Sequence, residues 1–198
     1  MFDALNRQTV AKVKKTGLPY FLITEADQVG DTFGERYTNA ITFVYNQGFD
    51  NVISIGNDTP KLQAHQLRTA ANHVQSGRVV LGPTKDGGFY LLGLPKRHFN
   101  SCEFLRLPWQ QASLYTTLVA GLQPDHNVVT LGALQDIDTL VDVRVLKNAY
   151  TISEKIKALL VQIVSIRVTD ISTVSPHYSL VYTSDYFNKG SPFRTNFS

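Results

Sequence analysis

Asp58 is the first acidic side chain whose setting could support chemistry. It follows Gly56 and the β-branched run 52–55, so we expect it just beyond the carboxyl end of a buried strand. Ligands of open α/β sheets bind in the crevice outside the carboxyl ends of the strands, where a carboxylate is well placed for catalysis. Alternatively, Asp58 only caps the helix expected to begin near Pro60, because aspartate is a favoured N-cap.

Asp136 and Asp138 form a second acidic pair near the end of the expected domain. Carboxylates at positions i and i+2 of an extended segment point the same way, so the two could share a divalent cation. Asp138 or Thr139 could instead cap a helix that begins near Leu140.

The segment Asp86-Gly87-Gly88 precedes an apolar run over residues 89–94. Two adjacent glycines let the backbone approach a ligand closely or take positive φ values. Asp86-Gly87 is also a common β-hairpin turn, and both interpretations can hold at once.

Alternating elements should position these residues. Before residue 83, the order helix, strand, helix predicts a three-layer α/β/α domain with right-handed crossovers and a mainly parallel sheet, with strand 52–55 near its centre. Helical spacing places Lys12 with other basic side chains on the solvent side of the first helix. The predicted helices are 4–16, 33–47, 61–76 and 113–122, the predicted strands are 19–24, 52–55, 78–83, 89–94 and 127–131, and 104–109 is predicted to be a strand-like loop. Residues 1–150 form this domain, and residues 151–198 form a helix (152–164) and a tail that pack on it.

Composition restricts the partners and the cellular location. The net charge of +3 is too small to argue for nucleic acid. A single cysteine, Cys102, excludes an internal disulfide framework and fits a reducing cytoplasm. The first residues lack the pattern of a secretory signal, and no apolar run reaches the roughly eighteen residues of a membrane span. We therefore expect a cytoplasmic protein without a membrane span or a nucleic-acid partner.

The chain resembles an uncharacterised bacterial family assigned to glycosyltransferases of the GT-A (nucleotide-diphospho-sugar transferase) fold. The resemblance covers about residues 18–146. It rests on the order of the segments Gln28–Arg36, Gly56-Asn57-Asp58-Thr59-Pro60, Leu81–Leu94 with Asp86-Gly87-Gly88, Pro108-Trp109 and Asp136-Ile137-Asp138-Thr139.

The resemblance implies a metal-dependent transferase that takes a nucleotide sugar or a nucleoside triphosphate as donor, with an unspecified acceptor. Asp58, Asp136 and Asp138 would hold Mg²⁺ or Mn²⁺. The catalytic residues would be Asp58, Asp86 and Asp138. The residues that would bind nucleotide or substrate are Arg36, Asn57, Lys85, Gly87, Gly88, Phe89 and Trp109.

Several positions depart from the family pattern. The chain starts at what looks like the helix after the family's first strand and its glycine- and lysine-rich donor loop, while Phe89 replaces tyrosine and Asn57 replaces serine. The alternative function is therefore a non-catalytic or degenerate nucleotide-binding or interaction protein on the same scaffold. An uncovered sheet edge would also need a cover, either the C-terminal segment or a second copy of the chain in a homodimer.

Overall fold

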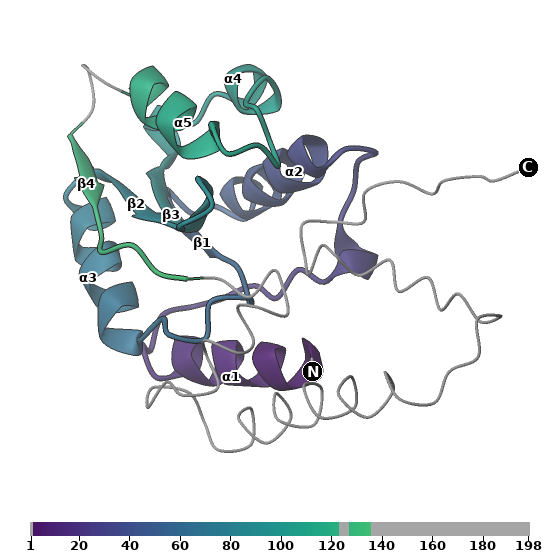
Figure 1. The fold of residues 1–198 in the computed structure, drawn as a ribbon. Coiled ribbons are helices and arrows are strands. Elements are labelled where there is room, and N and C mark those ends of the chain that lie inside the picture. The colour runs from purple at the N-terminus through teal and green to yellow at the C-terminus, as the bar shows by residue number, and fades with distance from the viewer. Residues whose placement is uncertain (1, 123–126, 136–198) are drawn as a thin grey trace, which may run out of the picture.

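The computed structural model describes residues 2–122 and 127–135 of the chain (Figure 1). Asp136, Asp138, the expected helix 152–164 and the expected tail lie outside these residues. The elements in chain order are α1 (Phe2–Lys14), η1 (Glu25–Asp27), α2 (Phe33–Asn46), β1 (Asn51–Ile55), α3 (Ala64–Gln75), β2 (Val79–Pro83), β3 (Phe89–Pro95), η2 (Lys96–His98), α4 (Ser101–Leu105), α5 (Leu114–Leu122) and β4 (Val128–Thr130).

Four strands form one mixed sheet in the order β1-β3-β2-β4. Strand β3 pairs antiparallel with both β1 and β2, whereas β2 and β4 pair in parallel. Three strands therefore run in one direction and β3 runs against them. The expected mixed α/β fold is confirmed. The sheet differs from the expectation at β3, because the tight turn before Phe89 is too short for the crossover that a parallel neighbour would need.

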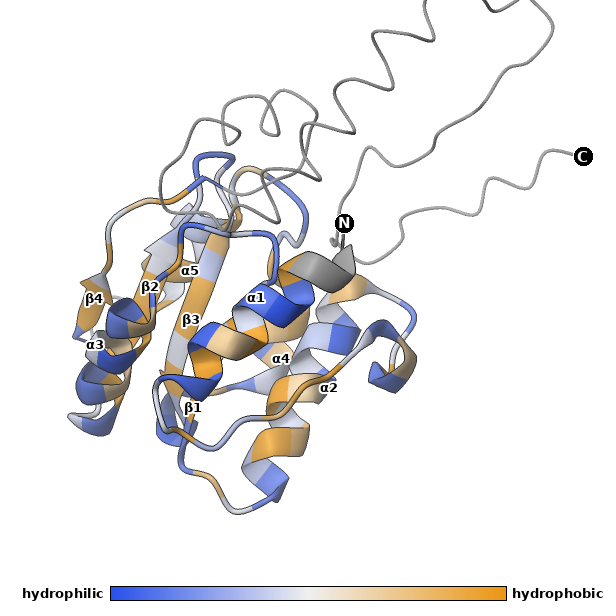
Figure 2. Ribbon diagram, turned by 90° about the horizontal axis from the view of Figure 1, so that it is seen from below, coloured by the Kyte–Doolittle hydropathy of each residue, from blue (hydrophilic) through white to orange (hydrophobic). Residues whose placement is uncertain are grey.

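Helices cover both faces of the sheet (Figures 1 and 2). Strands β2 and β3 are apolar almost throughout, as is typical of strands that are buried on both sides. On the face covered by α3, the core contains Leu62, Leu67, Ala70, Val74, Val80, Tyr90 and Leu91. On the face covered by α4 and α5, it contains Val79, Leu81, Leu92, Leu94, Phe104, Leu118 and Leu122.

Helix α2 begins with a capping box. The Glu35 amide donates to the Thr32 hydroxyl at 3.2 Å, and the Glu35 carboxylate accepts from the Thr32 amide at 2.8 Å. Further along the helix, Ile41 and Tyr45 pack against Val52 of β1. The Tyr45 hydroxyl donates to the Leu94 carbonyl at 2.8 Å, which ties α2 to the sheet.

Two sequence predictions about local structure are wrong. Residues 19–24 form no strand, although their composition favours one. Phe21 instead packs edge-on against Phe43 and Phe49, with ring centroids 5.8 and 5.5 Å apart, and the segment pairs with none of the described strands. The region 104–109 is also not strand-like, because α4 is held by Asn100, whose side chain accepts from two amides of the first turn.

Strand β1 lies at an edge of the described sheet, not near its centre as predicted. The Gly56 amide donates to the Tyr90 carbonyl across the β1–β3 pair. Because hydrogen-bonded positions alternate along an antiparallel strand, the N–H and C=O groups of Ile53 and Ile55 point away from β3. In the described part of the chain, β1 pairs with β3 alone. No helix within residues 2–122 and 127–135 is both long enough and apolar enough to span a membrane.

Candidate functional site

The loop after β1 holds Asp58 at the carboxyl end of the strand. A Cβ at Gly56 would lie 2.6 Å from the Asp58 Oδ1, so a larger residue at position 56 would require this carboxylate to move. The Thr59 hydroxyl donates to the same oxygen at 3.3 Å. The N-cap of α3 is Gln63, so the interpretation of Asp58 as a simple helix cap is wrong.

The turn between β2 and β3 lies at the same edge of the sheet. The Thr84 amide donates to the Gly88 carbonyl at 3.1 Å, and the Asp86 carboxylate accepts from the Gly88 amide at 3.1 Å and from the Thr84 hydroxyl. Gly87 has a φ of 92°, and a Cβ there would lie 2.0 Å from the Ala112 carbonyl oxygen. The Asp86 carboxylate therefore stabilises the turn, which is itself packed against the start of α5.

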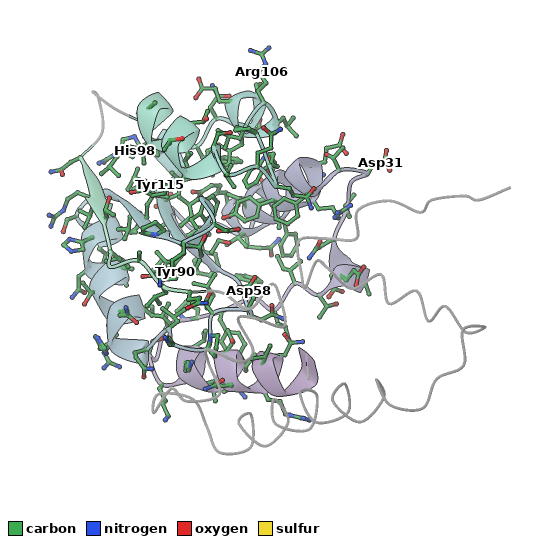
Figure 3. The ribbon with its side chains drawn as sticks, viewed as in Figure 1. Asp31, Asp58, Tyr90, His98, Arg106 and Tyr115 are labelled. Carbon is green, nitrogen blue, oxygen red and sulfur yellow. The ribbon has the colours of Figure 1, made fainter. Side chains whose placement is uncertain are left out.

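A third segment, residues 131–135, reaches this edge beside β2. The Leu134 amide donates to the Pro83 carbonyl at 3.1 Å, and the Tyr90 hydroxyl donates to the Gly132 carbonyl at 3.0 Å. Figure 3 places Tyr90 and Asp58 at the same end of the sheet, above α1, whereas Asp31 and Arg106 project outward elsewhere. The structure thus brings the loops of Asp58 and Asp86 together with the segment that leads to Asp136.

Helix α1 lies directly below the Asp58 loop (Figures 1 and 3). The Lys12 ammonium donates to the Pro60 carbonyl at 2.6 Å, and the Asn57 amide group donates to the Asn6 side-chain oxygen. The prediction that Lys12 faces solvent is wrong: it is half-buried, and burial lowers the pKa of its amine to about 8. One signal could have revealed it, because Lys12 lies two helical turns from the buried Leu5.

The predicted phosphate-binding cations differ in their surroundings. Arg36 donates to the Asp31 carbonyl at 3.0 Å and so holds the loop before α2. Lys85 is exposed in the same turn as Asp86. Of these two side chains, only Lys85 belongs to a loop at the carboxyl edge.

Phe89 and Trp109, both predicted to bind nucleotide, belong to an aromatic cluster. The Trp109 indole N–H donates to the Phe104 carbonyl at 2.7 Å, and its ring lies 4.8 Å from the Tyr37 ring and 6.2 Å from the Phe89 ring. A Cβ at Gly34 would lie 2.5 Å from the indole Cδ1. These rings pack α2 against the sheet, and nucleotide binding by Phe89 and Trp109 stays a prediction.

The predicted metal site is only partly described. Within residues 2–122 and 127–135, no three His, Cys, Asp or Glu side chains are grouped so as to hold a metal ion. Of the predicted ligands, the structure describes Asp58, while Asp136 and Asp138 lie outside it. Proteins often bind Mg²⁺ through one or two carboxylates together with substrate phosphates, and metal binding by Asp58 stays a prediction.

Comparisons with known proteins agree with the fold. No curated protein matches the chain. A crystal structure of a "putative nucleotide-diphospho-sugar transferase" from Desulfovibrio desulfuricans G20 is similar, with 28% sequence identity and a TM-score of 0.62. The similarity covers 72% of this chain and 64% of that protein, so the chain spans less than two thirds of the length of that protein. The fold is GT-A-like.

A family model matches residues 6–111, a range that includes Asp58, the turn 86–88 and Trp109 but ends before Asp136. The match spans more than half of the chain. The protein therefore belongs to the bacterial family described as "Uncharacterized protein conserved in bacteria (DUF2064)".

Proposed function

We propose that this protein is a metal-dependent transferase that uses a nucleotide-activated donor, for either glycosyl or nucleotidyl transfer. The observation that carries the proposal is the position of Asp58. Its carboxylate lies at the carboxyl end of β1, is not a helix cap, and faces the same edge as the Gly87-Gly88 turn. The similarity to a protein named as a nucleotide-diphospho-sugar transferase supports the donor class.

In this proposal Asp58 binds Mg²⁺ or Mn²⁺, with Asp136 and Asp138 as further ligands and Asp138 as a candidate base. Such an ion offsets the negative charge that develops on a departing diphosphate. The acceptor would lie beside the turn that Asp86 stabilises, on the side away from the Ala112 carbonyl that already fills the space at Gly87. Lys85, which is exposed at this turn, would contact phosphate oxygens.

Calorimetric titration tests the proposal. Nucleoside triphosphates and nucleotide sugars are titrated into the full chain with and without Mn²⁺, and then into Asp58→Asn. We expect at least one donor to bind with Mn²⁺ and the variant to bind about tenfold or more weakly, because a charged ligand of the ion is lost. Asp27→Asn is the control, because Asp27 is an exposed carboxylate that only binds Thr24. Failure of every donor to bind at millimolar concentration contradicts the proposal.

The alternative function, a non-catalytic nucleotide-binding or interaction protein, is favoured by one observation. Several predicted site groups already bind other parts of the protein: Asp86 its own turn, Arg36 a loop carbonyl and Trp109 the Phe104 carbonyl. A product assay separates the two functions. Release of nucleoside diphosphate or pyrophosphate from a bound donor with Mn²⁺ identifies a transferase, whereas binding without release identifies the alternative.

A further inference from the structure

The inner face of α1 carries two polar side chains where an amphipathic helix normally buries apolar ones. Gln8 and Lys12 lie one turn apart on the side of the helix that also buries Leu5. The outward residues Arg7 and Lys14 are exposed, so the basic side chains of α1 do not all need to be buried. Both inner residues are half-buried.

Lys12 is a half-buried cation without an anionic partner among the described residues. Its ammonium donates to the uncharged Pro60 carbonyl at 2.6 Å, although it carries three N–H groups. Burial lowers the pKa of its amine to about 8. A buried charge without a counter-charge costs free energy, which an anionic ligand would offset.

Gln8 supplies a polar atom that has no partner among the described residues. Its side-chain oxygen is buried and accepts no hydrogen bond from residues 2–122 or 127–135. Residues at i and i+4 of a helix are about 5–6 Å apart at their Cβ atoms, so Gln8 and Lys12 start from neighbouring positions on the same helix face. An anionic group that also carries a hydroxyl could engage both side chains.

We propose that α1 forms one wall of the donor site, in which Lys12 binds the diphosphate and Gln8 accepts a hydrogen bond from a hydroxyl of the same ligand. This inference rests on the proposed function for the identity of the ligand. The hydrogen bond from Lys12 to Pro60 joins α1 to the loop that carries Asp58. The hydrogen bond from Asn57 to Asn6 joins the same two segments. A nucleoside diphosphate offers both groups that would complete these contacts. Its phosphates would bind the Lys12 ammonium, and a sugar hydroxyl would donate to the Gln8 oxygen.

Competitive acetylation of the unmodified chain tests the site without any transferase assay. The full chain is treated with an acetylating reagent at about pH 8, with and without millimolar inorganic pyrophosphate, and each lysine is followed by peptide mass spectrometry. Pyrophosphate should lower the labelling of Lys12 several-fold and leave the exposed Lys14 and Lys15 unchanged. Equal labelling of Lys12 in both samples, or a Lys12 that the reagent never reaches, overturns the proposal.

Affinity measurements then separate the two side chains. In Lys12→Met, binding of pyrophosphate and of nucleoside diphosphates should weaken about ten- to hundredfold, because a charge-assisted contact is lost. In Gln8→Leu, nucleoside diphosphates should bind several-fold more weakly and pyrophosphate, which has no sugar hydroxyl, should bind unchanged. Lys14→Met is the matched control. Unchanged affinities in both inner-face variants overturn the proposal.

These outcomes are distinguishable from failure of the proposed function. If donor binding depends on Asp58 but not on Lys12, the proposed role of α1 in the donor site is wrong and the proposed transferase function still stands. Protection of Lys12 by pyrophosphate without binding of any nucleotide sugar supports an anion site and contradicts the transferase. If Lys12→Met does not fold, the acetylation of Lys12 in the unmodified chain still tests whether this residue binds the anion.

Discussion

The Tyr90 hydroxyl donates a hydrogen bond to the Gly132 carbonyl at 3.0 Å. The same residue accepts from the Gly56 amide through its backbone carbonyl at 3.4 Å. Tyr90 is only 2% exposed, and burial raises the pKa of its hydroxyl. One residue of β3 therefore joins the loop that carries Asp58 to the segment that leads to Asp136.

Loss of this hydroxyl should loosen the third segment. We expect Tyr90→Phe to lower the free energy of unfolding by about 1–2 kcal/mol, because the Gly132 carbonyl loses its hydrogen bond. Urea denaturation measures this change. Tyr115→Phe is the control: its hydroxyl shares a more exposed hydrogen bond with Thr130 at 3.1 Å and should matter by less than about 0.5 kcal/mol. Equal effects in the two variants would contradict a special role for Tyr90.

The turn between β2 and β3 should tolerate only glycine at position 87. Gly87→Ala places a Cβ against the Ala112 carbonyl and forces alanine into a left-handed backbone conformation. We expect a loss of about 2 kcal/mol or more in the free energy of unfolding. Gly121→Ala in α5 should instead stabilise the protein by about 0.5 kcal/mol, since its Cβ would meet nothing within 4 Å and alanine favours helix. Opposite signs in thermal unfolding would confirm the difference.

The contact between Gly34 and Trp109 can be followed by fluorescence, because the chain has a single tryptophan. Gly34→Ala should displace the indole, shift its emission to longer wavelengths and cost about 1–3 kcal/mol through overpacking. Gly132→Ala is the control, since its Cβ would meet nothing within 4 Å. An unchanged emission spectrum in Gly34→Ala would show that the added methyl group is accommodated without displacing the Trp109 indole, and would contradict the prediction.

The buried amine of Lys12 should make stability depend on pH. Burial lowers its pKa to about 8, from an ordinary value of 10.5, so the folded state releases this proton before the unfolded state does. Between about pH 8 and pH 10.5 the unfolded state binds more protons, and the Lys12 contribution to stability should rise with pH. The difference in urea-unfolding free energy between the natural protein and Lys12→Met should therefore change over this range. The difference for Lys14→Met should stay constant, and a constant difference for Lys12→Met would contradict the buried amine.

Self-association is a prediction, because β1 pairs with β3 alone in the described part of the chain. The segment 18–22 adjoins this strand, because Phe21 packs on Phe49 just before β1, and Leu22 is 59% exposed. We expect concentration-dependent dimers in light scattering, which Leu22→Lys should weaken through charge repulsion at an apolar contact. Leu105→Lys, at an exposed leucine on α4, should leave them unchanged. A natural protein that is monomeric at about 100 μM would make the dimer prediction wrong.

Much of the fold was predictable because strands β1, β2 and β4 and the longer helices carry strong local patterns. The direction of β3 was less certain, since an Asp-Gly turn is compatible with both a ligand loop and a hairpin. Residues 19–24 show the opposite case. Their composition favours a strand, but a strand exists only when another strand pairs with it, and pairing is not visible in local sequence.

The site was predictable in part for similar reasons. The position of Asp58 just beyond the carboxyl end of a strand was predictable from the apolar residues of β1, and its function stays a prediction. The burial of Lys12 was missed because a lysine in an amphipathic helix is normally assigned to the solvent side. The packing of Trp109 was missed because the partner that admits its ring is Gly34, which lies far away in the chain and carries no side chain of its own.

The aromatic cluster also bears on the order in which the protein folds. It joins residues 33–37 of α2 to residues 89–109, so its contacts close a long stretch of chain that contains β1, α3 and β2. Contacts between such distant segments form slowly, because the entropy of loop closure must be lost before they stabilise anything. The β2–β3 hairpin is local and can form early. We therefore expect the closure of α2 over Trp109 to be a late event in folding, so that tryptophan fluorescence would follow the completion of the domain and not its first collapse.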